Sequence, residues 1–116
     1  MKLQLIACLF FLSANLSSAS TAPNPLSNKC AGSKAKAYAD LKKGKVEFLI
    51  QGGIVARHYE GDKAFEQTYK IHYQDLGCVM PTDLCLDVYN QEVAVHLDKK
   101  YGKSWRKQVR KDVPGL

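Results

Sequence analysis

The fold is decided by the stretch from Val46 to Leu76, which reads VEFLIQGGIVARHYEGDKAFEQTYKIHYQDL. Apolar and polar side chains alternate at 46–51 and again at 70–76, a pattern that predicts two β-strands. Between them, Phe65 and Tyr69 have the spacing of one face of a short helix. The connection is also longer than the roughly twelve residues that a parallel crossover requires. We therefore expect two parallel strands joined through a helix.

The same stretch has a second interpretation. Gly52-Gly53 could form a two-residue turn that joins 46–51 to Ile54–Tyr59 as a β-hairpin. Residues 54–59 would then add a third, antiparallel strand at the edge of the sheet. Both arrangements satisfy the pattern of side chains.

Helical patterns flank these strands on both sides. Upstream, Ser33 can cap a helix, because its hydroxyl can accept hydrogen bonds from the free amides of the first turn, and Gly44 can end that helix. Downstream, the pattern predicts the longest helix, which begins at Thr82 or Asp83. Its buried stripe at helical spacing consists of Leu86, Tyr89, Val93 and Leu97.

The order of the elements indicates the fold class. Asp62 caps the short helix between the strands, Gly102 interrupts the long helix, and a last helix covers about 103–111. The resulting order is helix, strand, helix, strand, helix, helix. Such alternation predicts an α/β fold in which three to four helices pack a small sheet of two or three strands, at least two of them parallel.

Residues 1–19 have the three-part pattern of a secretory signal peptide. Lys2 supplies the positive charge, 3–12 is almost wholly apolar, and Ser17-Ser18-Ala19 fits a small-x-small cleavage site. The apolar run is too short for a membrane span, which needs about 20 residues. Residues 5–8 also look like a lipobox, but the apolar run continues beyond them. We therefore expect cleavage after Ala19 and export to the periplasm or the exterior.

The remaining chain is expected to form one domain. Residues 20–29 are rich in small polar residues and proline, which indicates a flexible lead-in, and 30–116 is then a single α/β domain. No later apolar run has the length of a membrane span, so we expect no transmembrane segment in the mature chain. Loss of Lys2 with the signal lowers the formal net charge from +6 to +5, which favours acidic partners.

Loss of the signal also leaves an odd number of cysteines, namely Cys30, Cys78 and Cys85. Exported proteins meet an oxidising environment, so we expect one disulfide and one leftover thiol. If the strands are parallel, all three cysteines lie at the edge of the sheet where the strands end, beside Gly52 and Gly53. Ligands of open α/β sheets commonly bind outside that edge.

Three cysteines allow three single bridges. We favour Cys30–Cys78, because its long loop gives a chain-entropy gain of roughly 3–4 kcal/mol, whereas Cys78–Cys85 is only a local bridge. Cys85 would then be free in the first turn of a helix, where the helix dipole favours the thiolate. A thiol-dependent redox function at Cys85 or Cys78 is therefore an alternative, although the chain has no Cys-x-x-Cys motif. The simpler interpretation is a disulfide that only stabilises the fold, together with an unreactive free thiol.

The C-terminal segment is strongly basic. On a helix, five of its cations would share one face opposite to Trp105 and Val109: Lys103, Arg106, Lys107, Arg110 and Lys111. Such a face could bind an acidic envelope protein or an anionic membrane surface, whereas export argues against a nucleic acid. The competing interpretation is a solvated face without a partner.

The chain carries few signals of catalysis. His58, His72 and His96 form no zinc-type spacing with the cysteines, so we expect no metal site. There is neither a glycine-rich phosphate loop nor a Gly-x-Ser-x-Gly nucleophile motif. We therefore expect no cofactor and no catalytic residues, and favour a non-enzymatic function.

Four blocks stand out in the second half of the chain. They are Phe65–Ile71 (FEQTYKI), Asp75–Cys78 (DLGC), Tyr89-Asn90 (YN) and Leu97–Arg106 (LDKKYGKSWR). In these blocks the chain resembles a family of small, exported, uncharacterised bacterial proteins. The resemblance implies a bacterial periplasmic or envelope setting and supports the order helix, strand, helix. It carries over no activity and no site residues.

Together these features predict an exported binding or interaction module of the bacterial periplasm or envelope. A purely structural or inhibitory partner of another exported protein would have the same features.

Overall fold

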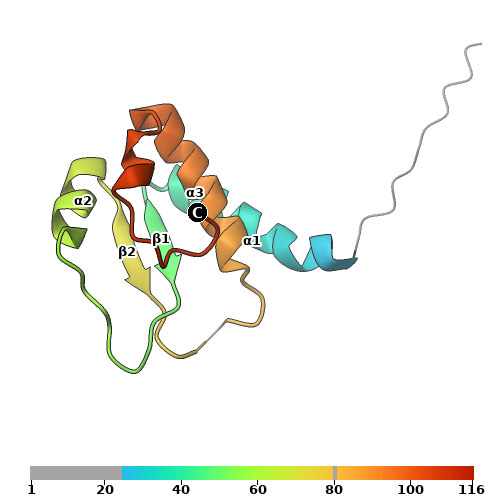
Figure 1. Cartoon of the computed structure of the whole chain (residues 1–116). Helices are drawn as coiled ribbons and strands as arrows, with labels where there is room; N and C mark the ends of the chain where they lie inside the picture. Colours follow the sequence, from blue (N-terminus) through green and yellow to red (C-terminus); the bar gives the residue numbers. More distant parts are fainter. Residues whose placement is uncertain (1–24, 80) are drawn as a thin grey trace, which may run out of the picture.

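The computed structural model describes residues 25–79 and 81–116 (Figure 1). The expected signal segment, its cleavage site and residues 20–24 lie outside these described residues. In chain order the elements are α1 (Pro25–Lys42), β1 (Glu47–Ile50), α2 (Asp62–Tyr69), β2 (His72–Asp75), α3 (Leu86–Tyr101) and the 3-10 helix η1 (Ser104–Lys107). The predicted small α/β fold, with helices packed on a two-stranded sheet, is confirmed.

The two strands are parallel, as the long connection between them predicted. Phe48 lies opposite Tyr73 in the register, and all four residues of β1 are buried. Backbone hydrogen bonds extend the pairing by one residue at each end, because His72 N donates to Val46 O and Leu76 N donates to Ile50 O. The carboxyl ends of both strands therefore meet at one edge of the sheet.

Asn90 of α3 occupies the edge of β1 that does not pair with β2. Its Oδ1 accepts a hydrogen bond of 2.8 Å from Leu49 N, and its Nδ2 donates one of 2.9 Å to Leu49 O. Asn90 is fully buried. Since its amide occupies backbone groups that a further strand would need, the hairpin interpretation of 54–59 is wrong. Those residues belong to the loop that joins β1 to α2.

The helices enclose a core rich in aromatic rings. α3 packs against β1, α1 packs against α3, and α2 lies beside β2 (Figure 1). The predicted stripe of the long helix is buried, and the Trp105 ring lies 5.7 Å from the ring of Phe48. The largest fully buried side chains include Phe48, Tyr89, Val93, Leu97 and Trp105. The core thus lies between the sheet, α3 and the C-terminal segment.

Both long helices begin elsewhere than predicted. α1 begins at Pro25 instead of Ser33, so residues 25–29 of the expected lead-in are helical. α3 begins at Leu86, after the N-cap residue Cys85, and with 16 residues it is shorter than α1 with 18. Within the part of the chain that the structure describes, no helix combines the length and the hydrophobicity needed to cross a bilayer.

The expected helix over 103–111 is wrong beyond its first turn. Gly102 ends α3 with φ 73°, and only Ser104–Lys107 is helical, in the 3-10 form. The chain from 108 to 116, here called the C-terminal tail, is irregular and buries Val109 and Val113. Asn90 Nδ2 also donates to Pro114 O at 3.0 Å. These contacts hold the tail on the core and prevent a longer helix.

Candidate functional site

The disulfide joins Cys30 to Cys85, with 5.4 Å between their Cα atoms. The favoured pair Cys30–Cys78 is therefore wrong, and Cys85 is not free. The cause is the packing of α1 on α3. One turn after Cys30, the buried Ser33 accepts on its Oγ a hydrogen bond of 2.7 Å from Cys85 N. The start of α3 is thereby held beside the first half of α1.

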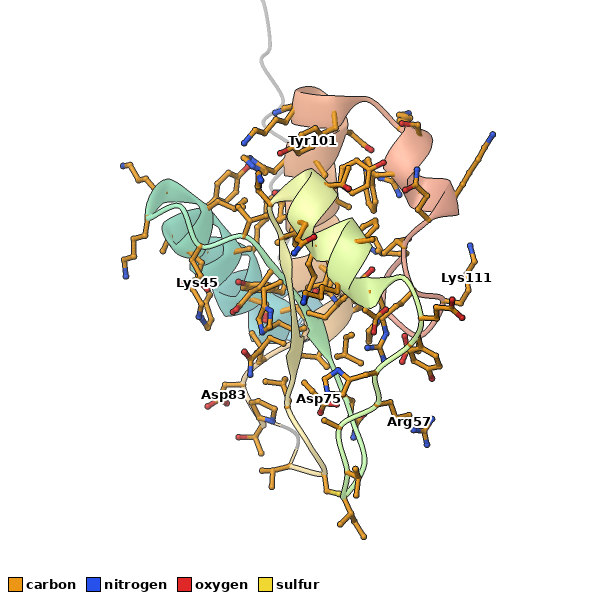
Figure 2. The ribbon with its side chains drawn as sticks, turned by 90° about the vertical axis from the view of Figure 1, so that its left-hand side faces the viewer. Lys45, Arg57, Asp75, Asp83, Tyr101 and Lys111 are labelled. Atoms are coloured by element: carbon orange, nitrogen blue, oxygen red, sulfur yellow. A yellow bond between two sulfur atoms is a disulfide. The ribbon has the colours of Figure 1, made fainter. Side chains whose placement is uncertain are left out.

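Cys78 is the leftover thiol, and it is exposed in the loop after β2. Among the described residues the structure has one bridge and one free thiol, which is the predicted count, but the bridge joins a different pair. The loops that follow the two strands also carry exposed apolar side chains, namely Ile54, Val55 and Val79. Figure 2 shows this end of the molecule below Arg57 and Asp75, with Tyr101 at the opposite end.

Arg106 of the expected basic face is bound to an acid. Its Nε and Nη2 donate hydrogen bonds of 3.0 and 2.8 Å to the two carboxylate oxygens of Asp98. Trp105 Nε1 donates to the same carboxylate at 3.0 Å. The hydrogen bond from Arg106 is the main reason that the pKa of Asp98 lies below its usual value. Arg106 therefore holds η1 on the end of α3.

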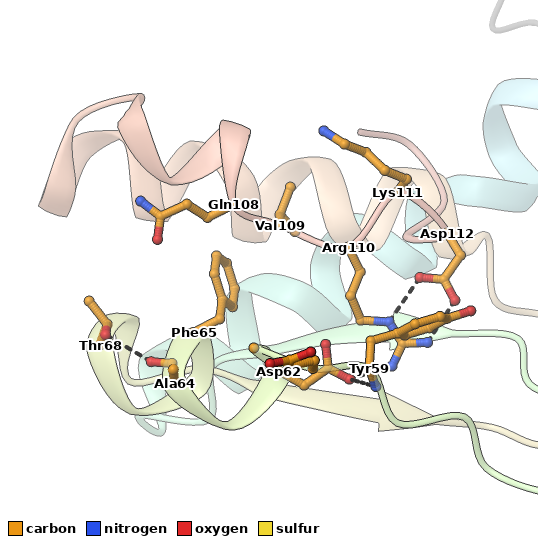
Figure 3. Close-up of a pocket in the computed structure, with 12 residues that line it drawn as sticks. Tyr59, Asp62, Ala64, Phe65, Thr68, Gln108, Val109, Arg110, Lys111 and Asp112 are labelled. Carbon is orange, nitrogen blue, oxygen red and sulfur yellow. Dashed lines mark hydrogen bonds and ion pairs between the residues drawn. The ribbon is translucent and has the colours of Figure 1, made fainter.

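Arg110, unlike Arg106, is enclosed, because its side chain is 8% exposed and that of Arg106 is 40% exposed. Its Nε and Nη2 donate to Asp112 at 2.9 and 2.6 Å, and its Nη1 donates to Asp62 at 3.2 Å and to Arg57 O at 3.0 Å (Figure 3). The guanidinium also lies 4.5 Å from the ring centre of Tyr59. Arg110 thus ties the tail to α2 and to the loop before it.

A cavity of about 540 Å³ lies beside Arg110, between α2 and the tail. Phe65 and Val109 face each other across it (Figure 3). The charged side chains at its inner end, Arg110 with Asp62 and Asp112, are paired with one another. The cavity therefore offers apolar contact, while its paired charges hold the fold together.

The expected basic face is consequently divided. Arg106 and Arg110 have carboxylate partners and do not form one helical face with the lysines. The other three members are exposed: Lys103, Lys107 and Lys111.

A second set of cations lies where the three α-helices end. Tyr69 and Tyr101, with ring centres 5.3 Å apart, place the ends of α2 and α3 together. In Figure 1 these helix ends lie away from the loops that follow the strands. We call the exposed lysines in or directly after the last helical turns the lysine-rich end: Lys42, Lys43, Lys70, Lys99 and Lys100.

Acids close to this end are already engaged. Asp40 accepts from Lys36 at 2.7 Å, Glu47 pairs with Lys45 at 3.0 Å, and Asp98 is bound by the arginine described above. Within residues 25–79 and 81–116, the five lysines of the lysine-rich end form no ion pair. Their charges therefore face solvent without a carboxylate partner in the described part of the chain, and Lys100 Nζ lies 5.4 Å from the ring centre of Tyr101.

The predicted set missed these lysines because they are distant in sequence. In the sequence, each of these lysines looks like part of an ordinary helix end, where the helix dipole favours a positive charge. The available signal was the order of the elements. α1 and α2 end directly before β1 and β2, and α3 runs back after β2, so all three helices end at the edge where the parallel strands begin.

His58 and His72 line one pocket, whereas His96 lies on another side of the fold, in the groove between α1 and α3. His72 Nδ1 lies 3.0 Å from Glu66 Oε1, His58 is in the exposed loop before α2, and His96 is on α3. Among the described residues, no group of three or more His, Cys, Asp or Glu side chains has the arrangement of a metal site.

Comparison of the chain with family models, with curated proteins and with solved structures found no match. The resemblance to small exported bacterial proteins therefore stays a prediction from the sequence.

Proposed function

We propose that this protein is an exported, non-enzymatic binding module of the bacterial envelope, and that its lysine-rich end binds an acidic component of that envelope. The observation that carries the proposal is that the arginines of the C-terminal segment are in ion pairs, whereas the lysines at the helix ends are not. The two arginines of the C-terminal segment, Arg106 and Arg110, are paired with Asp98, Asp62 and Asp112 of the same chain. The lysines at the helix ends face solvent unpaired.

The charge at this end exceeds what the helices themselves neutralise. Each helix C-terminus carries about half a negative charge, so three helix ends offset roughly one and a half of the five lysine charges. The remainder creates a positive potential that attracts anions and increases the rate of their association. A surface of this kind suits binding, since the lysines are in no hydrogen-bonded arrangement for chemistry.

Export is supported by the signal pattern at residues 1–19, and the Cys30–Cys85 bridge is consistent with an oxidising compartment. Intact-mass measurement on the protein recovered from cell fractions tests this part. We expect a periplasmic species that begins at Ser20. A full-length species retained in the cytosol would contradict export.

Binding is tested with two charge-matched variants. Lys42→Gln/Lys43→Gln/Lys99→Gln changes the lysine-rich end, and Lys103→Gln/Lys107→Gln/Lys111→Gln changes the C-terminal segment. Each lowers the net charge by three, and every replaced side chain is exposed. We expect the first variant to lose retention on cell-envelope extract and the second to keep most of it. If both variants and the unmodified protein were retained equally on cell-envelope extract, the proposal would be contradicted.

A thiol-dependent redox function is a second candidate, now resting on Cys78, because this thiol is exposed while Cys85 is bridged. It predicts rapid alkylation of Cys78 in the folded protein below neutral pH. Alkylation that becomes fast only near pH 8–9, as for an ordinary thiol with a pKa of about 8.5, would argue against it.

A further inference from the structure

A groove of about 560 Å³ lies on the outer surface between α1 and α3. Its apolar part includes Leu41 of α1 together with Tyr38 and Val95, which are 58% and 44% exposed. Tyr38 is therefore a large ring that the fold leaves in water, although the adjacent Ala37 is fully buried. Apolar side chains on both walls of one groove form a surface suited to an apolar or amphipathic partner.

The same groove is lined by Lys42 and Lys99 of the lysine-rich end. The acid that lines it, Glu92, is paired with Lys34 at 3.2 Å. His96 also lines the groove, and its pKa is lowered by burial and then by the positive charges of Lys100 and Lys99. The groove thus combines apolar walls with a cationic rim.

We infer that the groove between α1 and α3 docks on an anionic phospholipid surface, with Tyr38 and Val95 in the interfacial layer and Lys42 and Lys99 on lipid phosphates. This inference rests on the proposed function and names its acidic component as lipid. A tyrosine is well suited to the membrane interface, since its ring is apolar and its hydroxyl stays hydrated. Lysine stems can cover apolar surface while their charged ends reach the headgroups.

The pairing of charge with apolar surface is what favours lipid. An acidic polymer without apolar groups would satisfy Lys42 and Lys99 but leave Tyr38 and Val95 in water. A bilayer with anionic headgroups satisfies both kinds of side chain at once. The other large exposed apolar residues of the described chain lie outside this groove: Ile54, Val55, Tyr59, Val79 and Leu116. Ile54, Val55 and Val79 belong to the loops that follow the strands, and Figure 1 shows these loops away from the helix ends.

The test uses the full chain as the cell processes it, with its N-terminus established by intact mass. Flotation is measured with vesicles of phosphatidylglycerol and phosphatidylethanolamine, and with phosphatidylcholine vesicles as the uncharged comparison. Two groove variants, Tyr38→Ser/Val95→Ser and Lys42→Gln/Lys99→Gln, are compared with two matched controls. The controls are Ile54→Ser/Val55→Ser for the apolar pair and Lys103→Gln/Lys107→Gln for the charged pair. Circular dichroism confirms that each variant is folded.

We expect binding to the anionic vesicles only. Removal of two lysine charges should weaken it about thirtyfold. The apolar pair should weaken it about tenfold and leave a residual affinity that salt abolishes. Both controls should bind within about twofold of the unmodified protein. A Tyr38→Trp variant should show a blue shift of its added fluorescence on these vesicles.

Three results would overturn the inference. In the first, the unmodified protein is retained by envelope extract but not by anionic vesicles, which leaves the proposed function standing and replaces lipid by another acidic partner. In the second, the Ile54→Ser/Val55→Ser control loses more binding than the groove variants. In the third, sedimentation shows a dimer that Tyr38→Ser/Val95→Ser dissociates, so that a second copy covers the groove. Loss of retention on both extract and vesicles would remove the proposed function as well.

Discussion

Arg106 and Asp98 form a two-pronged ion pair, in which Nε and Nη2 of the arginine lie 3.0 and 2.8 Å from the two carboxylate oxygens. A planar guanidinium matches a carboxylate in this way, whereas a lysine supplies only a point charge. Arg110 repeats the arrangement with Asp112. The two arginines therefore fix the C-terminal segment to the fold. Both arginines are thus occupied within the chain, whereas the lysines of the lysine-rich end form no ion pair among the described residues.

The ion pair of Asp98 should make folding sensitive to acid. Because Arg106 lowers the pKa of Asp98 in the folded protein, this carboxyl contributes stability that is complete above its unfolded pKa of 3.8. That stability is lost as the pH falls through the lower, folded pKa. Asp98→Asn keeps an acceptor for Trp105 but removes the charge, so its denaturation midpoint should depend less on pH between about 5 and 2.

The control for this titration is Asp83→Asn, at an exposed position in the loop before α3. Urea denaturation at a series of pH values makes the comparison. An Asp98→Asn profile parallel to that of the unmodified protein would show that the ion pair contributes nothing to acid sensitivity.

Asn90 should be a major determinant of stability. Asn90→Leu leaves the backbone N–H and C=O of Leu49 buried without partners, since both bond to the Asn90 amide. We expect the free energy of unfolding to fall by about 2–4 kcal/mol. Gln91→Ala, at the exposed neighbouring position, should change it by less than about 0.5 kcal/mol. Similar urea midpoints for the two variants would mean that Asn90 does not complete the edge of β1.

The close approach of Gly52 to Asp75 gives a paired steric test. A Cβ at Gly52 would overlap the Asp75 carboxylate, whereas one at Gly53 meets open space. Gly52→Ala should therefore displace Asp75 from Gly77 N, to which it is hydrogen-bonded at 2.7 Å, and destabilise the protein by about 1–2 kcal/mol. Gly53→Ala is the control and should be nearly neutral. If Asp75→Ala does not reduce the cost of Gly52→Ala, the carboxylate is not the cause.

The disulfide can be tested by peptide mapping without reduction. We expect the Cys30 and Cys85 peptides to be linked and Cys78 to be alkylated in the folded protein. Cys85→Ser should lower the free energy of unfolding by about 4 kcal/mol, the chain-entropy value for a loop of 55 residues. Cys78→Ser should leave it nearly unchanged. A disulfide between Cys30 and Cys78 would contradict the Cys30–Cys85 bridge of the structure.

Local periodicity was sufficient to predict most of the fold. The alternation at 46–51 and 70–76 predicted both strands, and the long connection predicted that they are parallel. The same periodicity failed for 54–59, because the decision depended on Asn90, a residue some 40 positions away that bonds the edge of β1. A contact of that range leaves no trace in the pattern of a single strand.

The site was harder to predict for the same reason. A helical projection placed Arg106 and Arg110 on one face, but Gly102 ends α3, and Val109 and Val113 draw the tail onto the core. Pairing of the cysteines likewise depended on the packing of α1 against α3. Chain entropy compares loops only and does not contain that contact.

The central claim is that unpaired lysines at the helix ends, and not positive charge in general, bind an acidic envelope component. Its most direct test is the salt dependence of affinity for envelope extract, measured for the unmodified protein and for the two charge-matched triple variants. We expect Lys42→Gln/Lys43→Gln/Lys99→Gln to lower both the affinity and its dependence on ionic strength between about 50 and 300 mM. The variant with Lys103, Lys107 and Lys111 replaced should stay close to the unmodified protein. Equal losses in the two variants, or no loss in the first, would contradict the claim.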